Sequence, residues 1–406
     1  MFVTASSRKK QRPATASGRC SLFEPSHRRQ HRPYDWRAED QLMKVMRLFL
    51  SSALMAALTL KAGMTMADCR ITSGGAVPRV LNVPLLGGSL TVGRDVPLGT
   101  VIYMQKFEAG NAYSVTCDAY STSVVEYSYA STPLPLSSWA EGAAAGKMYE
   151  TGVPGIGVYF DRFGVLPDTA QLCYNSPRTC TSPVSNSYTV SFVKIGEVVS
   201  SGLIQAAQLP TGTTKISQTS DIEVVQWNLI GSMSIVSRTC ATPDVLVPMG
   251  THKADEFSGK NSFTPWVDFS IALNNCPAFH GTVKNSTQAP KWNDVDGSSN
   301  LDLRQQNTMS FKLTPLSPPV NSSLGILSLT QSSPGDAPAA TGVGVQVATG
   351  LGGTLPLDRL SASGITPLAL EGVSYNIPLK VRYIQTGDAI TGGPANASAT
   401  FLIEYR

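Results

Sequence analysis

The cysteines are the residues whose chemistry this sequence displays most directly. Six of the seven lie beyond residue 67, at Cys69, Cys117, Cys173, Cys180, Cys240 and Cys276. An even number of cysteines in an exported chain indicates disulfides, and six allow many pairings. Their order along the chain favours Cys69–Cys117, Cys173–Cys180 and Cys240–Cys276. No CxxC spacing occurs, so a zinc site is a poor alternative.

The sequence offers little material for catalysis. Only His252 and His280 lie beyond the first 67 residues, and no GxSxG, HExxH or phosphate-loop motif is present. Residues 293–302 contain several Asp and Asn side chains that could hold calcium, but the EF-hand spacing is missing and a solvated loop is the better interpretation. We therefore expect no catalytic residue, no metal site and no cofactor.

Aromatic residues with polar neighbours in the first half of the chain indicate a second kind of chemistry. Asp118, Tyr120, Trp139 and Tyr149 are the candidates that we select. Aromatic faces beside carboxylates and amides suit the binding of a carbohydrate. The alternative is that most of these aromatics are ordinary strand or core residues, and it is the stronger one for any single residue.

The elements that must position these residues are short strands. Alternating apolar and polar runs broken by Gly and Pro recur from residue 68 onward, and no long amphipathic helix is apparent, which predicts an all-β chain. The clearest run is the last one, in which Ala397, Ala399, Phe401, Ile403 and Tyr405 share one face. The sequence shows no partner strand after it, so its far edge must be covered from outside or stay open.

The first 67 residues are expected to be a leader. From Met43 a basic start is followed by an apolar run and small residues at Thr65 and Ala67, which predicts a signal peptide over 43–67. Residues 1–42 are interpreted as an upstream extension, with the true start at Met1 or Met43 left open.

Removal of the leader reverses the charge. Residues 1–67 hold 12 of the 32 basic and 4 of the 28 acidic residues, so the remaining 339 carry 20 basic and 24 acidic ones. Their net charge is near −4, and no basic face remains for a nucleic-acid partner.

The C-terminal part of the chain, roughly residues 238–406, resembles the pilins that are assembled by the chaperone/usher pathway. The resemblance lies in Arg238-Thr239-Cys240, the V-x-V-x-x-G step from Val245, the strand ending at Cys276, and the closing Phe401-Leu402-Ile403-Glu404-Tyr405. It implies an incomplete immunoglobulin-like sandwich that lacks its last strand. It also implies a groove lined by Val245 and Val247 on the first pilin strand and by Phe401, Ile403 and Tyr405 on the last.

We therefore expect two β-sandwich domains: a lectin-like, receptor-binding domain over 68–232 and a pilin domain over 238–406. The resemblance implies a fimbrial tip adhesin, located in the fimbrium, that binds a host glycan or glycoprotein. Its other partners would be a periplasmic pilus chaperone, an outer-membrane usher and the adjacent fimbrial subunit, which donates a strand. A minor pilin that initiates or caps the fimbria is the alternative, and a secreted hydrolase on a β-sandwich is third.

Overall fold

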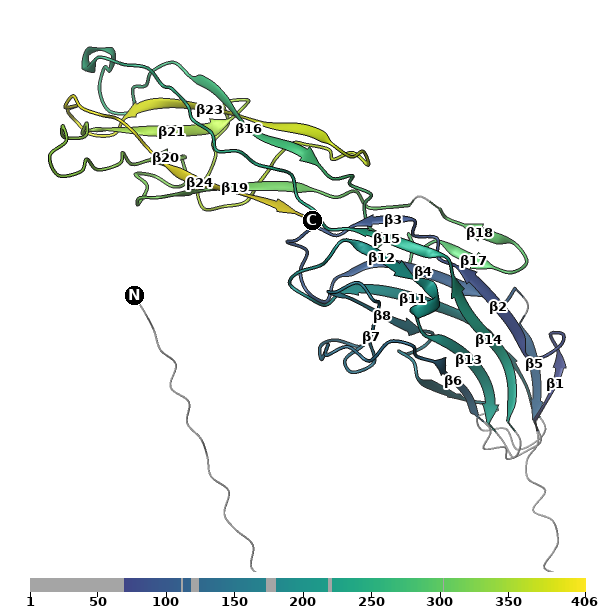
Figure 1. Ribbon diagram of the computed structural model, residues 1–406. Helices are drawn as coiled ribbons and strands as arrows, with labels where there is room; N and C mark the ends of the chain where they lie inside the picture. The colour runs from purple at the N-terminus through teal and green to yellow at the C-terminus, as the bar shows by residue number, and fades with distance from the viewer. Residues whose placement is uncertain (1–68, 111, 118–123, 173–179, 218–220, 302) are drawn as a thin grey trace, which may run out of the picture. The chain divides into compact units, whose positions relative to one another are not determined.

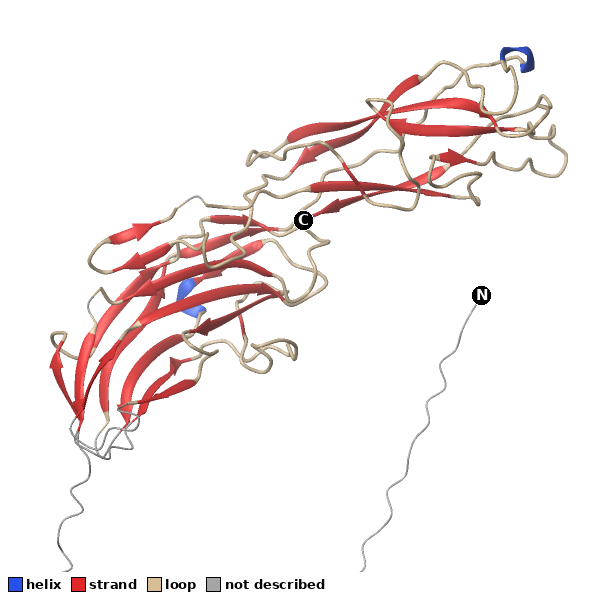
Figure 2. Cartoon of the chain, turned by 180° about the vertical axis from the view of Figure 1, so that it is seen from behind, coloured by secondary structure: helices blue, strands red, loops and turns tan. Residues whose placement is uncertain are grey.

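The structure is a computed structural model that describes residues 69–406 except 111, 118–123, 173–179, 218–220 and 302 (Figure 1). The expected leader lies outside this range. All described residues belong to one compact unit, Thr65–Arg406. Strands make up nearly all of the regular structure, with two single 3-10 turns, η1 (Ala206–Gln208) and η2 (Ala254–Glu256) (Figure 2). The prediction of an all-β chain is confirmed. No helix among these residues is long and apolar enough to cross a membrane.

The strands of the N-terminal half, which we define as residues 69–236, are short. They are β1 (Cys69–Ser73), β2 (Arg79–Pro84), β3 (Ser89–Thr91), β4 (Val101–Glu108), β5 (Tyr113–Cys117), β6 (Val124–Ser131), β7 (Tyr149–Glu150), β8 (Ile156–Asp161), β9 (Asp168–Gln171), β10 (Cys180–Val184), β11 (Ser187–Lys194), β12 (Gly202–Gln205), β13 (Thr211–Ser217), β14 (Ile222–Ile230) and β15 (Ser232–Val236).

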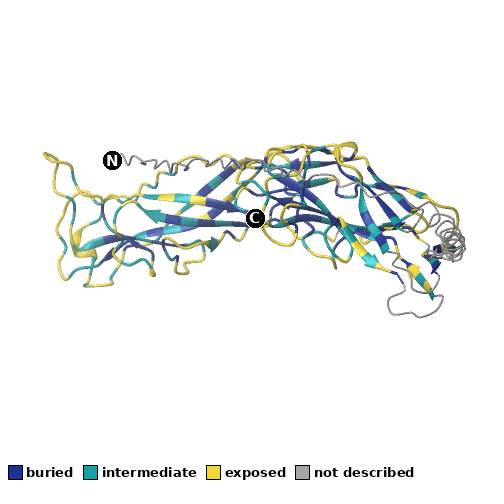
Figure 3. Ribbon diagram, turned by 90° about the horizontal axis from the view of Figure 1, so that it is seen from below, coloured by how far each residue is buried: buried dark blue, intermediate teal, exposed yellow. Residues whose placement is uncertain are grey.

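Two sheets enclose the core of the N-terminal half. One has the order β2-β14-β13-β6-β9, and the other β18-β17-β4-β11-β8-β7, in which β17 (Lys291–Asn293) and β18 (Gly297–Ser299) come from much later in the chain. Both sheets contribute buried residues to a single hydrophobic cluster, and the burial alternates along the strands (Figure 3). Two small sheets, β1-β5-β10 and β12-β15-β3, complete this half.

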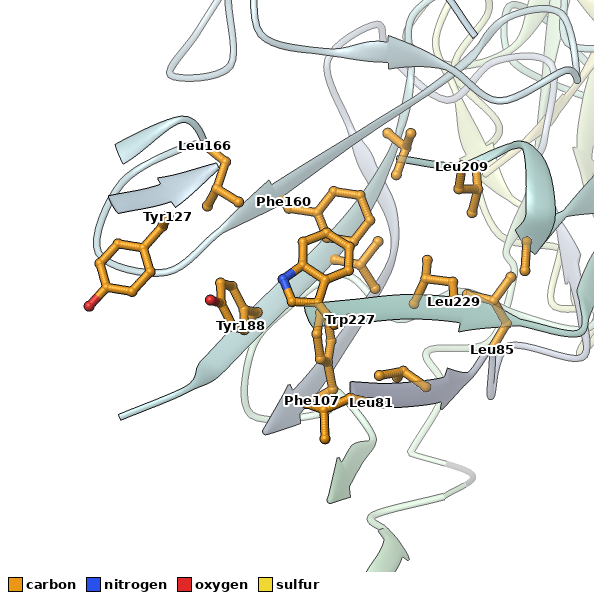
Figure 4. Close-up of a cluster of buried hydrophobic side chains, with 14 of the residues drawn as sticks. Leu81, Leu85, Phe107, Tyr127, Phe160, Leu166, Tyr188, Leu209, Trp227 and Leu229 are labelled. Atoms are coloured by element: carbon orange, nitrogen blue, oxygen red, sulfur yellow. The ribbon is translucent and has the colours of Figure 1, made fainter. Parts of the chain in front are cut away.

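Trp227 is at the centre of that cluster (Figure 4). Its ring centroid lies 4.5 Å from that of Phe160, 5.3 Å from that of Phe107 and 5.6 Å from that of Tyr188. Gly212 of the neighbouring strand faces the indole so closely that an added Cβ would lie 2.1 Å from a ring carbon. Glycine is required here because the side chain of the tryptophan fills the space that any other residue would use.

The C-terminal half, residues 237–406, has a core of its own. Its strands are β16 (Val267–Cys276), β19 (Met309–Pro315), β20 (Ile326–Leu327), β21 (Val343–Thr349), β22 (Ser361–Ala362), β23 (Val373–Gln385) and β24 (Ala399–Tyr405). They form the sheets β16-β23-β21-β20 and β22-β19-β24, and both contribute residues to the second hydrophobic cluster.

Two disulfides lie within the described residues, one in each half. Cys69–Cys117 joins β1 to β5 at directly paired positions, with a Cα–Cα distance of 4.0 Å. Cys240–Cys276 ties the start of the C-terminal half to the end of β16. The third expected bridge involves Cys173, which lies outside the described residues.

Two expectations differ from the structure. Residues 242–253, expected to contain the first pilin strand with Val245 and Val247, are not a strand, because their backbone forms no ladder with either sheet. Side chains still alternate there, since Val245 and Val247 are half-buried whereas Leu246 is exposed. The polar segment from residue 293, expected to be a solvated loop, instead belongs to the hairpin β17–β18.

Candidate functional site

Strand β24 is paired along one edge only. Thr308 and Arg406 exchange backbone hydrogen bonds of 2.7 and 3.0 Å, which fixes the phase of the antiparallel pairing with β19. With this phase, the backbone groups of Phe401, Ile403 and Tyr405 point away from β19. No described strand pairs with that side of β24. This side of β24 therefore presents backbone donors and acceptors that no described strand pairs with, and we call it the open edge.

Apolar side chains from the chain after Cys240 and from the C-terminal segment pack against the second core. Half-buried members packed against the second core are Val245, Val247, Met249, Ala395, Ala397, Ala399 and Phe401. Ile403 and Tyr405, which the sequence placed in the same groove wall, are only 6% and 4% exposed and so belong to the core itself. The ring of Tyr405 stacks on that of Phe279, with centroids 6.1 Å apart. Of the three predicted residues on β24, Phe401 is the accessible one.

Two cavities lie near the C-terminal segment, one at β24 and one at the residues before it. One of about 270 Å³ is lined by residues including Phe257, Tyr383 and Ala395. Another of about 170 Å³ is lined by residues including Thr242, Phe401 and Ile403. Both are bounded on one side by the chain after Cys240 and on the other by β24 or the residues before it. Space for additional side chains therefore exists on both sides of the half-buried row.

A loop of the N-terminal half occupies the end of the open edge. The Asp95 carboxylate accepts a hydrogen bond of 3.1 Å from the backbone N–H of Tyr405, and the Arg94 guanidinium donates one of 3.3 Å to the carbonyl of Ile403. Gly93 lies so close that an added Cβ would be 2.0 Å from the Tyr405 carbonyl oxygen. These contacts use the last backbone groups that β24 offers on this side.

A buried lysine holds this loop from the inside. Lys194 of β11 is 1% exposed, and its ammonium donates to the carbonyls of Arg94 and Val96, the latter at 2.7 Å. Burial lowers the pKa of Lys194, and the nearby carboxylates of Glu197 and Asp95 oppose that shift. The loop is thus bonded to the central sheet of the N-terminal half on one side and to the open edge on the other.

Two of the four residues predicted to bind a ligand lie within the described residues. The Trp139 indole donates a 2.7 Å hydrogen bond to the carbonyl of Glu141, and its ring packs on a small cluster that includes Met148. Tyr149 packs edge-on against Tyr129, with centroids 5.1 Å apart, beside the main core. Both aromatics therefore have packing roles. Asp118 and Tyr120 lie outside the described residues.

Polar groups line up on the outer face of the sheet containing β8. Asp161 lies beside Thr189 of β11, which in turn lies beside Lys106 of β4. Burial raises the pKa of the Asp161 carboxyl to about 6, although the Lys106 charge opposes the shift. Next along the chain, Phe163 is 79% exposed, with the Arg162 guanidinium 4.6 Å from its ring centroid. No pattern in the sequence indicated this grouping, because its residues come from different strands and a loop.

Comparison with known proteins identifies both halves. Residues 83–222 match the family model "MrkD-like receptor binding domain", and residues 230–406 match "Fimbrial protein". The type-1 fimbrial protein A chain of Escherichia coli is 41% identical over 185 residues, which cover 42% of this chain and 78% of that protein. The chain belongs to the fimbrial protein family.

Similarity to an adhesin extends over both halves of this fimbrial protein. A fimbria adhesin protein of Klebsiella pneumoniae is 24% identical over 333 residues, covering 78% of this chain and 89% of that protein. The crystal structure of the receptor binding domain of a plasmid-born adhesin of the same species covers 43% of this chain and 98% of its own, at 23% identity and a TM-score of 0.29.

The chain is a two-domain fimbrial adhesin, because its first half matches a receptor-binding family model and its second half a fimbrial one. From here we call its two parts the receptor-binding domain and the pilin domain. It belongs to an adhesive and structural class rather than an enzymatic one, and its place is the fimbria at the cell surface. The pilin domain implies assembly with other subunits. Sequence reasoning missed Arg94 and Asp95, because two adjacent charges in a loop carry no pattern that points to β24.

Proposed function

We propose that the pilin domain is an incomplete immunoglobulin-like sandwich whose open edge accepts a strand from another protein. A periplasmic chaperone binds there first, and the adjacent subunit replaces it at the outer-membrane usher. The observation that carries this proposal is the unpaired backbone row of β24 beside the half-buried apolar side chains. An added strand gains main-chain hydrogen bonds from the first and side-chain pockets from the second.

Neighbouring side chains on β24 provide the test. Phe401 is half-buried on the groove face, whereas Leu402 is 42% exposed on the other face. Phe401→Asp buries a charge where apolar side chains must dock, so we expect loss of co-purification with the chaperone. Leu402→Asp places the same charge in solvent and is expected to leave capture unchanged. Equal capture of both variants would contradict the groove assignment.

We further propose that the receptor-binding domain binds a glycan or a glycoprotein on a host surface. The match to a receptor-binding family model supports binding in general. The exposed ring of Phe163, with the Arg162 guanidinium beside it, supports the sugar class, since sugars bind to aromatic faces with polar groups at their rim. The boundaries 68–232 and 238–406 and the leader over 43–67 remain part of this proposal.

The binding experiment uses the exported chain purified with its chaperone, screened on a glycan array and against matrix proteins. Saturable glycan binding that Phe163→Ala weakens at least tenfold is the expected result. Val198→Ala is the matched control, because Val198 is 78% exposed elsewhere on the same domain. Binding to matrix proteins stripped of glycans, with none on the array, would contradict the sugar class.

A further inference from the structure

One segment of the pilin domain leaves it and returns at the same point. Thr282 and Gln305 pair through two backbone hydrogen bonds of 2.9 and 2.8 Å. The chain between them, residues 283–304, contains the hairpin β17–β18. Its two ends are adjacent, so this segment, which we call the excursion, is not needed to connect the pilin strands around it.

The excursion packs into the receptor-binding domain. Strand β17 pairs in parallel with β4, and the backbone N–H of Lys106 donates a hydrogen bond of 2.9 Å to the carbonyl of Pro290. Val283 and Ala289 are 3% and 0% exposed and belong to the core cluster around Trp227. Trp292 packs partly buried against the same cluster. These are core contacts of the receptor-binding domain, made by residues of the other half of the chain.

Polar contacts hold the tip of the hairpin. The Asp294 carboxylate forms an ion pair of 2.5 Å with the guanidinium of Arg79. It also accepts a hydrogen bond of 2.8 Å from the backbone N–H of Gly110. The Asn293 side chain accepts a hydrogen bond of 2.9 Å from the backbone N–H of Val295, and this bond stabilises the turn. Of the acidic residues that might have held calcium, Asp294 is thus used in docking.

Arg304 anchors the returning end. Its guanidinium donates to the carbonyls of Gly87 at 2.5 Å, of Ser89, and of His280 at 3.2 Å. Two of these acceptors belong to the receptor-binding domain and one to the pilin domain. The excursion is therefore fixed at its start by core burial, at its tip by an ion pair and at its end by a shared guanidinium.

We propose that the edge of β4 is a second strand-acceptor site, which the chain fills with its own excursion, and that the receptor-binding domain is completed only by this segment. Without it, β4 would present an unpaired edge, next to Tyr103 and Phe107, each 1% exposed in the complete domain. Binding competence then depends on the presence of the pilin domain, and the connection near Ser237 is not the only physical link between the domains.

The first test removes the excursion. Because Thr282 and Gln305 are paired, an Asn-Gly turn can replace residues 283–304 while the pilin strands stay joined. Amide exchange of β4, residues 101–108, is expected to accelerate at least tenfold, whereas chaperone capture by the pilin domain stays unchanged. A synthetic peptide of residues 281–305 should restore the protection. Unchanged β4 exchange in the deletion variant, or failure of the peptide to restore it, would overturn the proposal.

The second test keeps the native sequence around the hairpin, in case the deletion variant does not fold. A protease site is inserted between Ser237 and Arg238, and the chain is cut after folding. The two disulfides that lie within the described residues are on opposite sides of the cut. We expect the fragments to co-elute under native conditions, and Trp292→Ala to raise their dissociation constant at least tenfold. Separation of the two fragments on a native column when Trp292 is unchanged would refute the proposal.

Discussion

The contact of Asp95 with β24 allows a sharp test of how the open edge ends. Asp95→Ala removes the acceptor for the Tyr405 backbone N–H, a bond of 3.1 Å. A hydrogen bond to a charged group contributes about 1.5–3 kcal/mol. The Asp95 side chain is 25% exposed, so solvent competes and the lower end, about 1.5 kcal/mol, applies. A loss of about 1.4 kcal/mol corresponds to about a tenfold change in an opening equilibrium.

Hydrogen exchange of the C-terminal peptide measures this change directly. We expect the amide of Tyr405 to exchange about tenfold faster in Asp95→Ala, through local opening of the last residues of β24. Asp95→Asn keeps an acceptor oxygen without the charge. The exchange rate of the Tyr405 amide in this variant should lie between the rates in the unmodified protein and in Asp95→Ala. Arg94→Ala, which frees the Ile403 carbonyl, completes a double-mutant cycle. Unchanged exchange at Tyr405 in Asp95→Ala would refute the assignment of this bond.

The same contact sets a limit on the incoming strand. Under the proposed assembly, backbone groups at Phe401 are free to pair, whereas the N–H of Tyr405 and the carbonyl of Ile403 already have partners. A donor strand would therefore end its pairing before Tyr405 or displace the loop. Arg94 and Asp95 thus act as positioning residues for strand register, and they belong to the receptor-binding domain.

Two further predictions concern the receptor-binding domain. Burial raises the folded-state pKa of Asp161 to about 6, above its ordinary value, so its stabilising contribution is complete below about pH 4 and is lost as the pH rises through about 6. Asp161→Asn should raise Tm at pH 7 and flatten Tm between pH 4 and 6; an unchanged pH profile would contradict this. Gly212→Ala should cost about 1–3 kcal/mol in denaturant unfolding, because its Cβ would overlap the Trp227 ring. Gly392→Ala, in open space, is the control, and equal stability of the two variants would contradict the packing argument.

Much of the architecture could be predicted because it follows local rules. The period-two pattern of Val225, Trp227 and Leu229 reports a strand with one buried face, and all three residues are buried in β14. The pairing of Cys69 with Cys117 follows from order, since each is near the start or end of a strand in the same half of the chain. The terminal strand could be predicted from the same period-two pattern, and its residues carried the resemblance to the pilin family.

Other features depend on contacts that no local pattern encodes. Val245 and Val247 alternate as a strand does, but a ladder needs a partner, and none of the described strands pairs with residues 242–253. Trp139 is an aromatic residue of a type that often binds sugars, yet its ring packs in the small cluster with Met148 and Val193. A side chain's type shows what it is able to do, whereas its neighbours decide whether it is free to do so.

The excursion shows why the division into two domains was only partly readable from the sequence. Residues 293–302 are rich in Asp and Asn, which on composition alone predicts a solvated loop. Their partners, Arg79 and the backbone of Gly110, lie about two hundred residues earlier, a separation over which no periodicity can act. An apolar Trp292 placed between polar turns was the remaining signal, since an exposed indole in a solvated loop would be costly. Under the proposed function, a pull on a bound ligand passes from the receptor-binding domain to the pilin domain. The excursion pairs with β4 and returns to the pilin domain, so it adds a second route for that force besides the linker.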